Sequence, residues 1–192
     1  MPTTALSSSP RIEAAPWQVA PPRLLPAWAA RPLVTAAEVE AYIPQRRPFA
    51  LIDTLYHCQP DEAWAGLRVR PDHLMVHLGY LSEAGILESM AQAVALKAGY
   101  EARQQGIAPR VGFIAALKAV YIHTLAPVGC TLLTHAEIVL QAPDVLVVKT
   151  TSGYNATLVA HCEMRLFLEP EPAPNLGLDS FLHPSAAVEY AH

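Results

Sequence analysis

The chain has 192 residues, of which 52% are hydrophobic and 16% charged, so it can bury one well-formed core but is too short for two ordinary domains. Its formal net charge of -4 provides no overall basic field for gripping phosphate backbones, which argues against a nucleic-acid partner. No stretch is apolar for long enough to span a bilayer and no leader-like segment is visible, so the sequence predicts a cytoplasmic protein without membrane contact.

Proline is concentrated at both ends of the chain. Seven of the 18 prolines fall within the first 32 residues, and the segment after Glu169 is again rich in proline. Because proline fixes φ and lacks a backbone donor, these segments cannot sustain a long helix or a central strand. The sequence therefore predicts a Pro-rich N-terminal extension at residues 1–33, a single domain at 34–169 and a flexible C-terminal tail at 170–192.

The first regular element expected is a short helix over residues 35–43. Thr35 and Glu38 have the spacing of a capping box, and Pro44 would end the helix. Two strands are expected next, with a turn at residues 60–61 between them: 49–58 and 64–70.

A long helix is then predicted from Ser82, a favourable N-cap, to Gly106, a favourable C-terminal stop. Its first half is apolar almost all round, so this helix should be buried. Four further strands are expected, at residues 112–123, 130–141, 145–152 and 157–168. The last of these alternates apolar and polar residues, the period of a sheet with one buried face. Short turns favour antiparallel hairpins, and the whole pattern predicts an α+β domain with a sheet wrapped around one helix.

Three stretches of the chain resemble motifs of the bacterial 3-hydroxyacyl-carrier-protein dehydratases, in the same order and at about the same separations. Residues 43–53 (IPQRRPFALID) resemble the opening L-P-H-R-x-P-F-L-L-V-D, and residues 85–93 (GILESMAQA) resemble the E-x-M-A-Q start of the central helix. Residues 113–119 (FIAALKA), with Pro-Val-Gly at 127–129, resemble the strand and turn F-x-x-x-x-x-A-x-F…P-V-x-P-G-D. The resemblance implies the hotdog fold, an antiparallel sheet around a long central helix in a single domain.

The same resemblance implies a dimer in which two sheets join edge to edge and each active site takes one residue from each subunit. In that family a histidine before the helix is the base and a carboxyl group on the partner's helix is the acid. Glu88 matches the acid, and His77 is the expected base with His73 as its rival. His77 precedes Glu88 by eleven residues, about three fewer than in the family, and the usual P-x-M-P-G loop is missing. This divergent loop is similar to that of dehydratase subunits from aryl-polyene pigment clusters, some of which work as unlike pairs.

Dehydration of a 3-hydroxyacyl thioester requires a base for the C2 proton, an acid for the hydroxyl group and positive potential at the thioester oxygen. His77 and Glu88 would supply the first two, and the amides at the helix start, around Gly85, the third. Gln92, one turn after Glu88, is expected to contact substrate or to anchor the helix. No cofactor or metal is expected, because the family's substrate is carried on the phosphopantetheine of acyl carrier protein. Four further histidines fall inside the predicted strands and share no ligand spacing, so metal binding by them is not expected: His57, His123, His135 and His161.

The predicted function is the dehydration of 3-hydroxyacyl groups on acyl carrier protein to trans-2-enoyl thioesters, in fatty acid or polyene pigment biosynthesis. Arg46 and Arg47 are candidates for contacting the acidic carrier. The assembly would be a homodimer or a heterodimer with another hotdog subunit. Two alternatives remain open: a non-catalytic subunit that completes an active partner, and an acyl thioesterase in which the helix carboxylate directs water at the thioester carbonyl.

Overall fold

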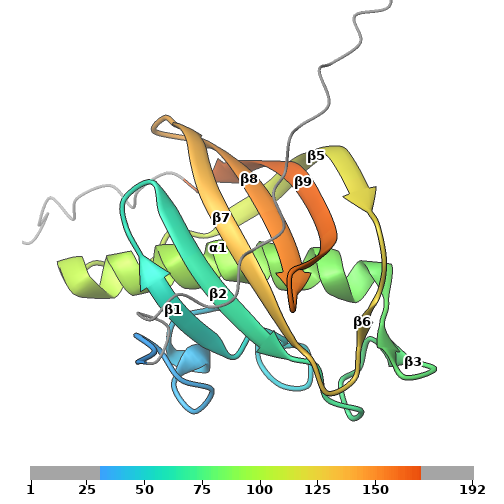
Figure 1. Ribbon diagram of the computed structural model, residues 1–192. Helices are drawn as coiled ribbons and strands as arrows, with labels where there is room; N and C mark the ends of the chain where they lie inside the picture. Colours follow the sequence, from blue (N-terminus) through green and yellow to red (C-terminus); the bar gives the residue numbers. More distant parts are fainter. Residues whose placement is uncertain (1–30, 170–192) are drawn as a thin grey trace, which may run out of the picture.

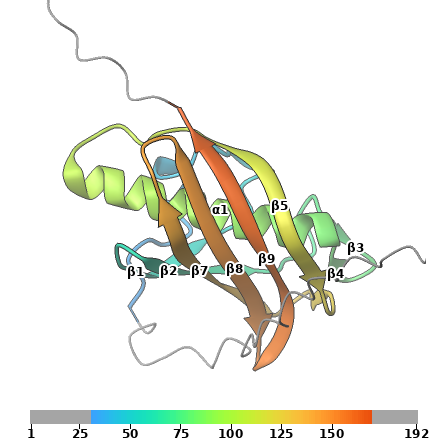
Figure 2. The same ribbon diagram turned by 90° about the horizontal axis from the view of Figure 1, so that it is seen from above.

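The computed structural model describes residues 31–169, which form a large antiparallel sheet and one long helix, α1 (Glu83–Gln105) (Figure 1). The sheet lies across α1 in both views (Figure 2). This arrangement confirms the α+β hotdog fold predicted from the sequence. The predicted N-terminal extension, except for residues 31–33, and the predicted C-terminal tail lie outside the described residues.

Six strands form the main sheet, and every neighbouring pair is antiparallel. Their spatial order is β1 (Thr54–Cys58), β2 (Glu62–Arg68), β7 (Thr131–Gln141), β8 (Val145–Tyr154), β9 (Thr157–Leu168) and β5 (Gly112–Ile122). Three short strands form a second sheet in the order β3 (Val76–His77), β4 (Tyr80–Leu81) and β6 (Ala126–Pro127). The sequence predicted the six long strands but not the short ones, because two residues are too few to show a period.

The helix predicted over residues 35–43 is wrong in type and length, since only the 3-10 turn η2 (Val39–Ala41) forms there. The capping contact itself is present: Glu38 Oε2 accepts hydrogen bonds from the Thr35 amide at 3.0 Å and from its hydroxyl group at 2.7 Å. Such a short segment cannot sustain an isolated helix. Instead, burial of Val39 and Ile43 in the core sets its path.

α1 begins and ends where the sequence predicts. The Ser82 hydroxyl oxygen accepts a hydrogen bond from the Gly85 amide at 3.2 Å, and Gly106 adopts a left-handed φ of 69°, which glycine adopts at no steric cost. Ile86, Met90 and Leu96 are completely buried in the core cluster, together with inward residues of the strands. Within residues 31–169, no helix has the length and apolar character needed to cross a membrane.

β5 forms one edge of the main sheet, and in the described part of the chain no strand pairs with its outer side. Its large apolar side chains remain exposed, including Phe113, Ile114, Leu117 and Tyr121. An exposed apolar edge strand is a template for pairing with another strand, and contiguous apolar surface marks interaction sites. A second sheet can therefore add to the domain along β5.

Gly99 allows the loop at residues 40–46 to lie directly on α1. A Cβ atom at this position would lie 1.8 Å from the Tyr42 carbonyl oxygen, and a backbone atom cannot turn away as a side chain can. We expect Gly99→Ala to push the loop off the helix and to lower the free energy of unfolding by about 1–3 kcal/mol, although alanine is the better helix former. Chemical denaturation measures this change. Gly112→Ala is the control, because a Cβ there would meet its nearest atom, of Leu168, at an ordinary 3.4 Å; equal losses in both variants would contradict the packing argument.

Candidate active site

A groove of about 440 Å³ runs beside α1. Its walls are the loop at residues 40–46, helix positions between 88 and 99, the start of β5, the start of β8 and the end of β9. Small side chains at Ala91, Ala95 and Ala98 keep the helix wall low, and Glu88 is the carboxyl group that α1 contributes to this wall. The structure thus places the predicted acid on the surface of a largely apolar groove.

The buried side chain of Gln92, one helical turn after Glu88, forms a hydrogen bond with the Glu88 carboxyl group. The Gln92 side chain is completely buried, and its Oε1 accepts hydrogen bonds from the Leu51 amide at 2.7 Å and the Ile52 amide at 3.1 Å. Its Nε2 donates to the Phe49 carbonyl oxygen and to Glu88 Oε1, both at 2.8 Å. Backbone amides can only donate, so the side-chain oxygen must face them and the NH₂ group must face Glu88. One Glu88 oxygen is therefore fixed as an acceptor, and Oε2 is left to carry a proton.

The two candidate bases lie in different surroundings. His77 is exposed on the β3–β4 hairpin, opposite Tyr80. His73 is buried in the preceding loop, where its Nδ1 lies 3.5 Å from the Arg70 amide nitrogen and its Nε2 has no hydrogen-bond partner among residues 31–169. Burial first, and then the Arg70 charge, lower the pKa of His73, which favours its neutral form. Within the described part of one protomer, neither histidine is hydrogen-bonded to Glu88.

Gly85 packs the start of α1 against the β3–β4 hairpin. A Cβ at this position would lie 2.6 Å from Leu81 Cδ1 and 2.9 Å from Met75 Cβ, so a side chain has no room there. Because the Gly85 amide donates to the Ser82 cap, the amides of Glu83 and Ala84 are the ones that a ligand can reach at this exposed helix start. Of the two predicted substrate-binding residues, Gly85 therefore lies at the capped start of α1, and Gln92 is buried and hydrogen-bonded to Glu88.

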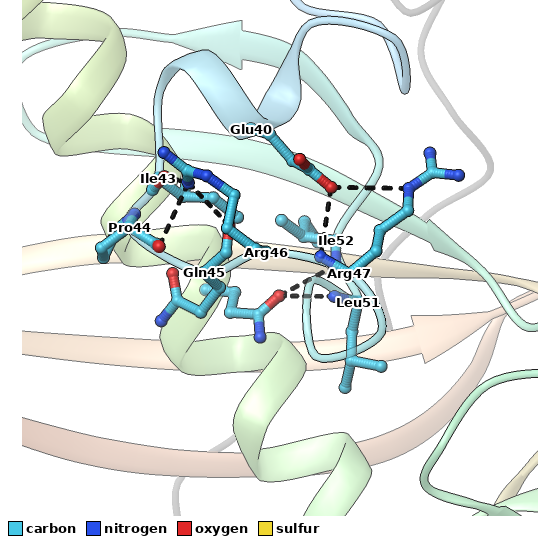
Figure 3. A network of polar contacts seen from close by, with 9 residues as sticks. Glu40, Ile43, Pro44, Gln45, Arg46, Arg47, Leu51 and Ile52 are labelled. Atoms are coloured by element: carbon cyan, nitrogen blue, oxygen red, sulfur yellow. Dashed lines mark hydrogen bonds and ion pairs between the residues drawn. The ribbon is translucent and has the colours of Figure 1, made fainter.

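The loop at residues 43–46 contributes groove residues, of which the sequence singled out only Arg46, as a candidate contact for the carrier. Arg46 Nη1 donates hydrogen bonds to the carbonyl oxygens of Ile43 at 2.7 Å, Pro44 at 3.1 Å and Gln45 at 2.9 Å, so the loop curls around this guanidinium group (Figure 3). Pro44, Gln45 and Arg46 all line the groove. The acceptors are backbone carbonyls, which no residue pattern reveals; the one available signal was that these residues belong to the first dehydratase-like motif.

The four histidines predicted in strands lie on or beside the sheet and contact protein groups, as expected. His57 and His135 each place Nε2 near a different oxygen of Glu62, at 3.3 Å and 2.9 Å. His123 Nε2 and His161 Nδ1 are 3.2 Å apart. The side chains of these four histidines therefore interact with other side chains of the sheet.

Comparison with solved structures gives the same fold. A chain of the dehydratase heterocomplex ApeI:P from Xenorhabdus doucetiae superposes with a TM-score of 0.64 at 17% identity, over 69% of this chain and 91% of that chain. Cj0977, a sigma28-regulated virulence protein from Campylobacter jejuni, gives 0.55 at 13% identity, over 72% and 92%. The smu.793 protein from Streptococcus mutans UA159, solved with acetyl CoA, gives 0.52 at 16% identity, over 67% and 97%.

Comparison at the family level is more specific. No curated protein matches the chain. A family model named ApeP-like and described as ApeP dehydratase matches residues 37–176, which include the groove loop, α1 and all strands of both sheets. Most of the sequence is covered by this match, so the resemblance to dehydratases seen in three short motifs extends over the whole domain. The chain belongs to the ApeP-like dehydratase family, whose fold is the hotdog fold.

Proposed function

We propose that this protein removes water from 3-hydroxyacyl thioesters on acyl carrier protein, giving trans-2-enoyl thioesters for fatty acid or polyene pigment synthesis in the cytoplasm. The proposal depends on Glu88, a carboxyl group that lines a largely apolar groove while a buried amide fixes one of its oxygens. The second oxygen can then hold a proton and deliver it to the leaving hydroxyl group. The phosphopantetheine arm is the substrate's carrier, and no further cofactor is proposed.

A second hotdog subunit completes the site in this proposal. The β3–β4 hairpin pairs with β6, which closely follows β5 in the chain. The hairpin therefore lies near the C-terminal end of β5. Antiparallel pairing of two such edges brings this end beside the N-terminal end of the other subunit's edge strand. In this chain that N-terminal end lines the Glu88 groove. A histidine from one subunit thereby approaches the carboxyl group of the other.

The partner is another hotdog subunit, unlike or identical. The relative from Xenorhabdus doucetiae comes from a heterocomplex, which supports an unlike partner. Co-purification with a candidate hotdog partner, followed by activity measurements on the chain alone and on the pair, separates the possibilities. Enoyl thioester formed by the chain alone would identify a homodimer. If enoyl thioester forms only with the partner, and replacement of Glu88 does not affect the rate, the chain is a non-catalytic subunit. Release of free thiol would identify a thioesterase.

His77 remains the proposed base, and His73 remains its rival. We expect alanine at the true base to lower kcat by about 10²–10⁴-fold and alanine at the other histidine to have a small effect. Because His73 is buried, His73→Gln is measured beside His73→Ala, and thermal unfolding shows whether each variant is folded.

The pH profile distinguishes the two histidines further. A base must be unprotonated, and the lowered pKa of His73 keeps it so at more acidic pH than an ordinary histidine with a pKa of about 6.5. If His73 is the base, kcat/KM should persist below that range. Full activity of both alanine variants would refute a histidine base in this chain.

A further inference from the structure

A second hollow lies next to the Glu88 groove, farther along α1. Its volume is about 260 Å³, and it is lined by the C-terminal half of α1, the connection from α1 to β5, the end of β7, the start of β8 and the end of β9. The two hollows have five lining residues in common, four of them apolar: Val94, Ala98, Arg110, Leu146 and Leu168. The second hollow therefore adjoins the groove across a boundary that is mainly apolar.

The boundary between the two hollows is low on its helix side and held in place on its sheet side. Ala98 contributes only a methyl group there and is exposed. Arg110 donates hydrogen bonds to the carbonyl oxygens of Glu169 at 2.7 Å and Pro143 at 2.6 Å, which ties the connection after α1 to the sheet ends at β9 and β8. A ligand that lies along α1 thus meets a methyl group at this boundary and not a bulky side chain.

The proposed reaction defines the direction in which an acyl chain lies in the groove. At the start of α1 the amides of Glu83 and Ala84 are the ones that a ligand can reach, so the thioester group belongs on the N-terminal side of Glu88. Carbon 3 must lie beside the Glu88 carboxyl group, and the rest of the chain then runs along α1 past Ala95 and Ala98. The acyl chain therefore points from the groove toward the second hollow.

We propose that the second hollow takes the distal end of long acyl chains and that Ala98 sets the chain length that this protein accepts. Ala98 follows Glu88 by ten positions, which is about 15 Å along the helix axis. An extended alkyl chain advances roughly 1.3 Å per carbon, so about twelve carbons beyond carbon 3 reach the level of Ala98. A decanoyl chain then ends in the groove, whereas a hexadecanoyl chain enters the second hollow. This inference rests on the dehydratase function proposed above.

Polar groups in the second hollow limit how far an alkyl chain extends. The Lys97 side chain is buried, where its ammonium group donates to the Pro60 carbonyl oxygen at 3.1 Å and pairs with Glu101. Gln105 and Gln141 line the same hollow. An alkyl chain gains free energy by leaving water, but not by covering groups that need hydrogen bonds. Among the residues that the structure describes, none of β5 lines this hollow, so this chain alone sets the length limit.

Binding of unreactive ligands measures the accepted chain length directly. Decanoyl and hexadecanoyl pantetheine amides are compared below the concentrations at which they form micelles, because they have no 3-hydroxyl group to eliminate and no thioester to hydrolyse. The full chain is used, with its hotdog partner where the pair is needed. The unmodified protein should bind the hexadecanoyl ligand at least about tenfold more tightly than the decanoyl ligand, since more methylene groups leave water. Ala98→Phe should bring this ratio to about one without weakening decanoyl binding.

Two further variants complete the experiment. Ala98→Leu should lower the ratio in the same direction and keeps the test available if the phenylalanine variant does not fold. Gln104→Phe adds the same ring at an exposed position of α1 outside both hollows and should leave the ratio unchanged. A ratio of about one in the unmodified protein, or an unchanged ratio in a folded Ala98→Phe or Ala98→Leu variant, overturns the inference while the dehydratase function stands. Absence of enoyl product from 3-hydroxyacyl thioesters of either length, with the unmodified protein and its partner, overturns the proposed function itself.

Discussion

Replacing Glu88 by glutamine is expected to lower kcat for dehydration by about 10²–10⁴-fold without unfolding the protein. An amide cannot deliver a proton to the leaving hydroxyl group, yet its oxygen can still accept the hydrogen bond that Gln92 Nε2 gives at 2.8 Å. The groove should therefore keep its shape, and KM should change much less than kcat. Enoyl thioester formation by the purified chain, with its partner present, measures the effect.

Glu137→Gln is the matched control for this experiment. Glu137 lies on β7, is exposed and does not line the groove, so its replacement should leave kcat unchanged. Thermal unfolding of both variants separates loss of chemistry from loss of structure. Wild-type turnover by the Glu88→Gln variant would rule out Glu88 as the acid, whatever the position of the histidines.

The parts of the fold that sequence predicts well are those that depend on neighbours in the chain. Ser82 and Gly106 mark the ends of α1 because capping and left-handed φ are local requirements. The alternation along β9 likewise needs only the period of one strand. The prediction of a helix at residues 35–43 is wrong because this segment is short. In so short a segment, packing and not local preference decides the conformation.

The candidate site was only partly predictable because its contacts join distant segments. Glu88 could be identified from its motif, but the backbone partners of Gln92 are 40 to 43 residues away in the chain. Arg46 is hydrogen-bonded to backbone carbonyl groups, which have no signature in the sequence. The choice between His77 and His73 stays a prediction, since it depends on a second subunit that the pattern of one chain does not describe.

Gln92→Leu is expected to lower the free energy of unfolding by about 3–5 kcal/mol and to impair catalysis as well. Leucine has similar bulk but leaves the buried amides of Leu51 and Ile52 without an acceptor, at a cost of about 1–3 kcal/mol each, and also removes the donor to the part-buried Phe49 carbonyl group. Denaturant unfolding measures the loss, with Gln59→Leu as an exposed control that should change stability by less than about 0.5 kcal/mol. Equal stability of these two variants would mean that Gln92 does not anchor the helix.

Gln92→Glu separates the two roles of this side chain. The introduced carboxyl group can still accept from the Leu51 and Ile52 amides, but when ionised it faces Glu88 across the former 2.8 Å hydrogen bond. Two carboxylates in contact cannot both stay ionised, so the pair of carboxyl groups keeps one proton to higher pH in the folded state than in the unfolded chain. The free energy of unfolding of the Gln92→Glu variant should then be close to wild type at acidic pH, where the bound proton replaces the lost amide donor. It should fall as pH rises between about 5 and 8. A variant whose stability relative to wild type is independent of pH would show that Gln92 and Glu88 are not in contact in the folded protein.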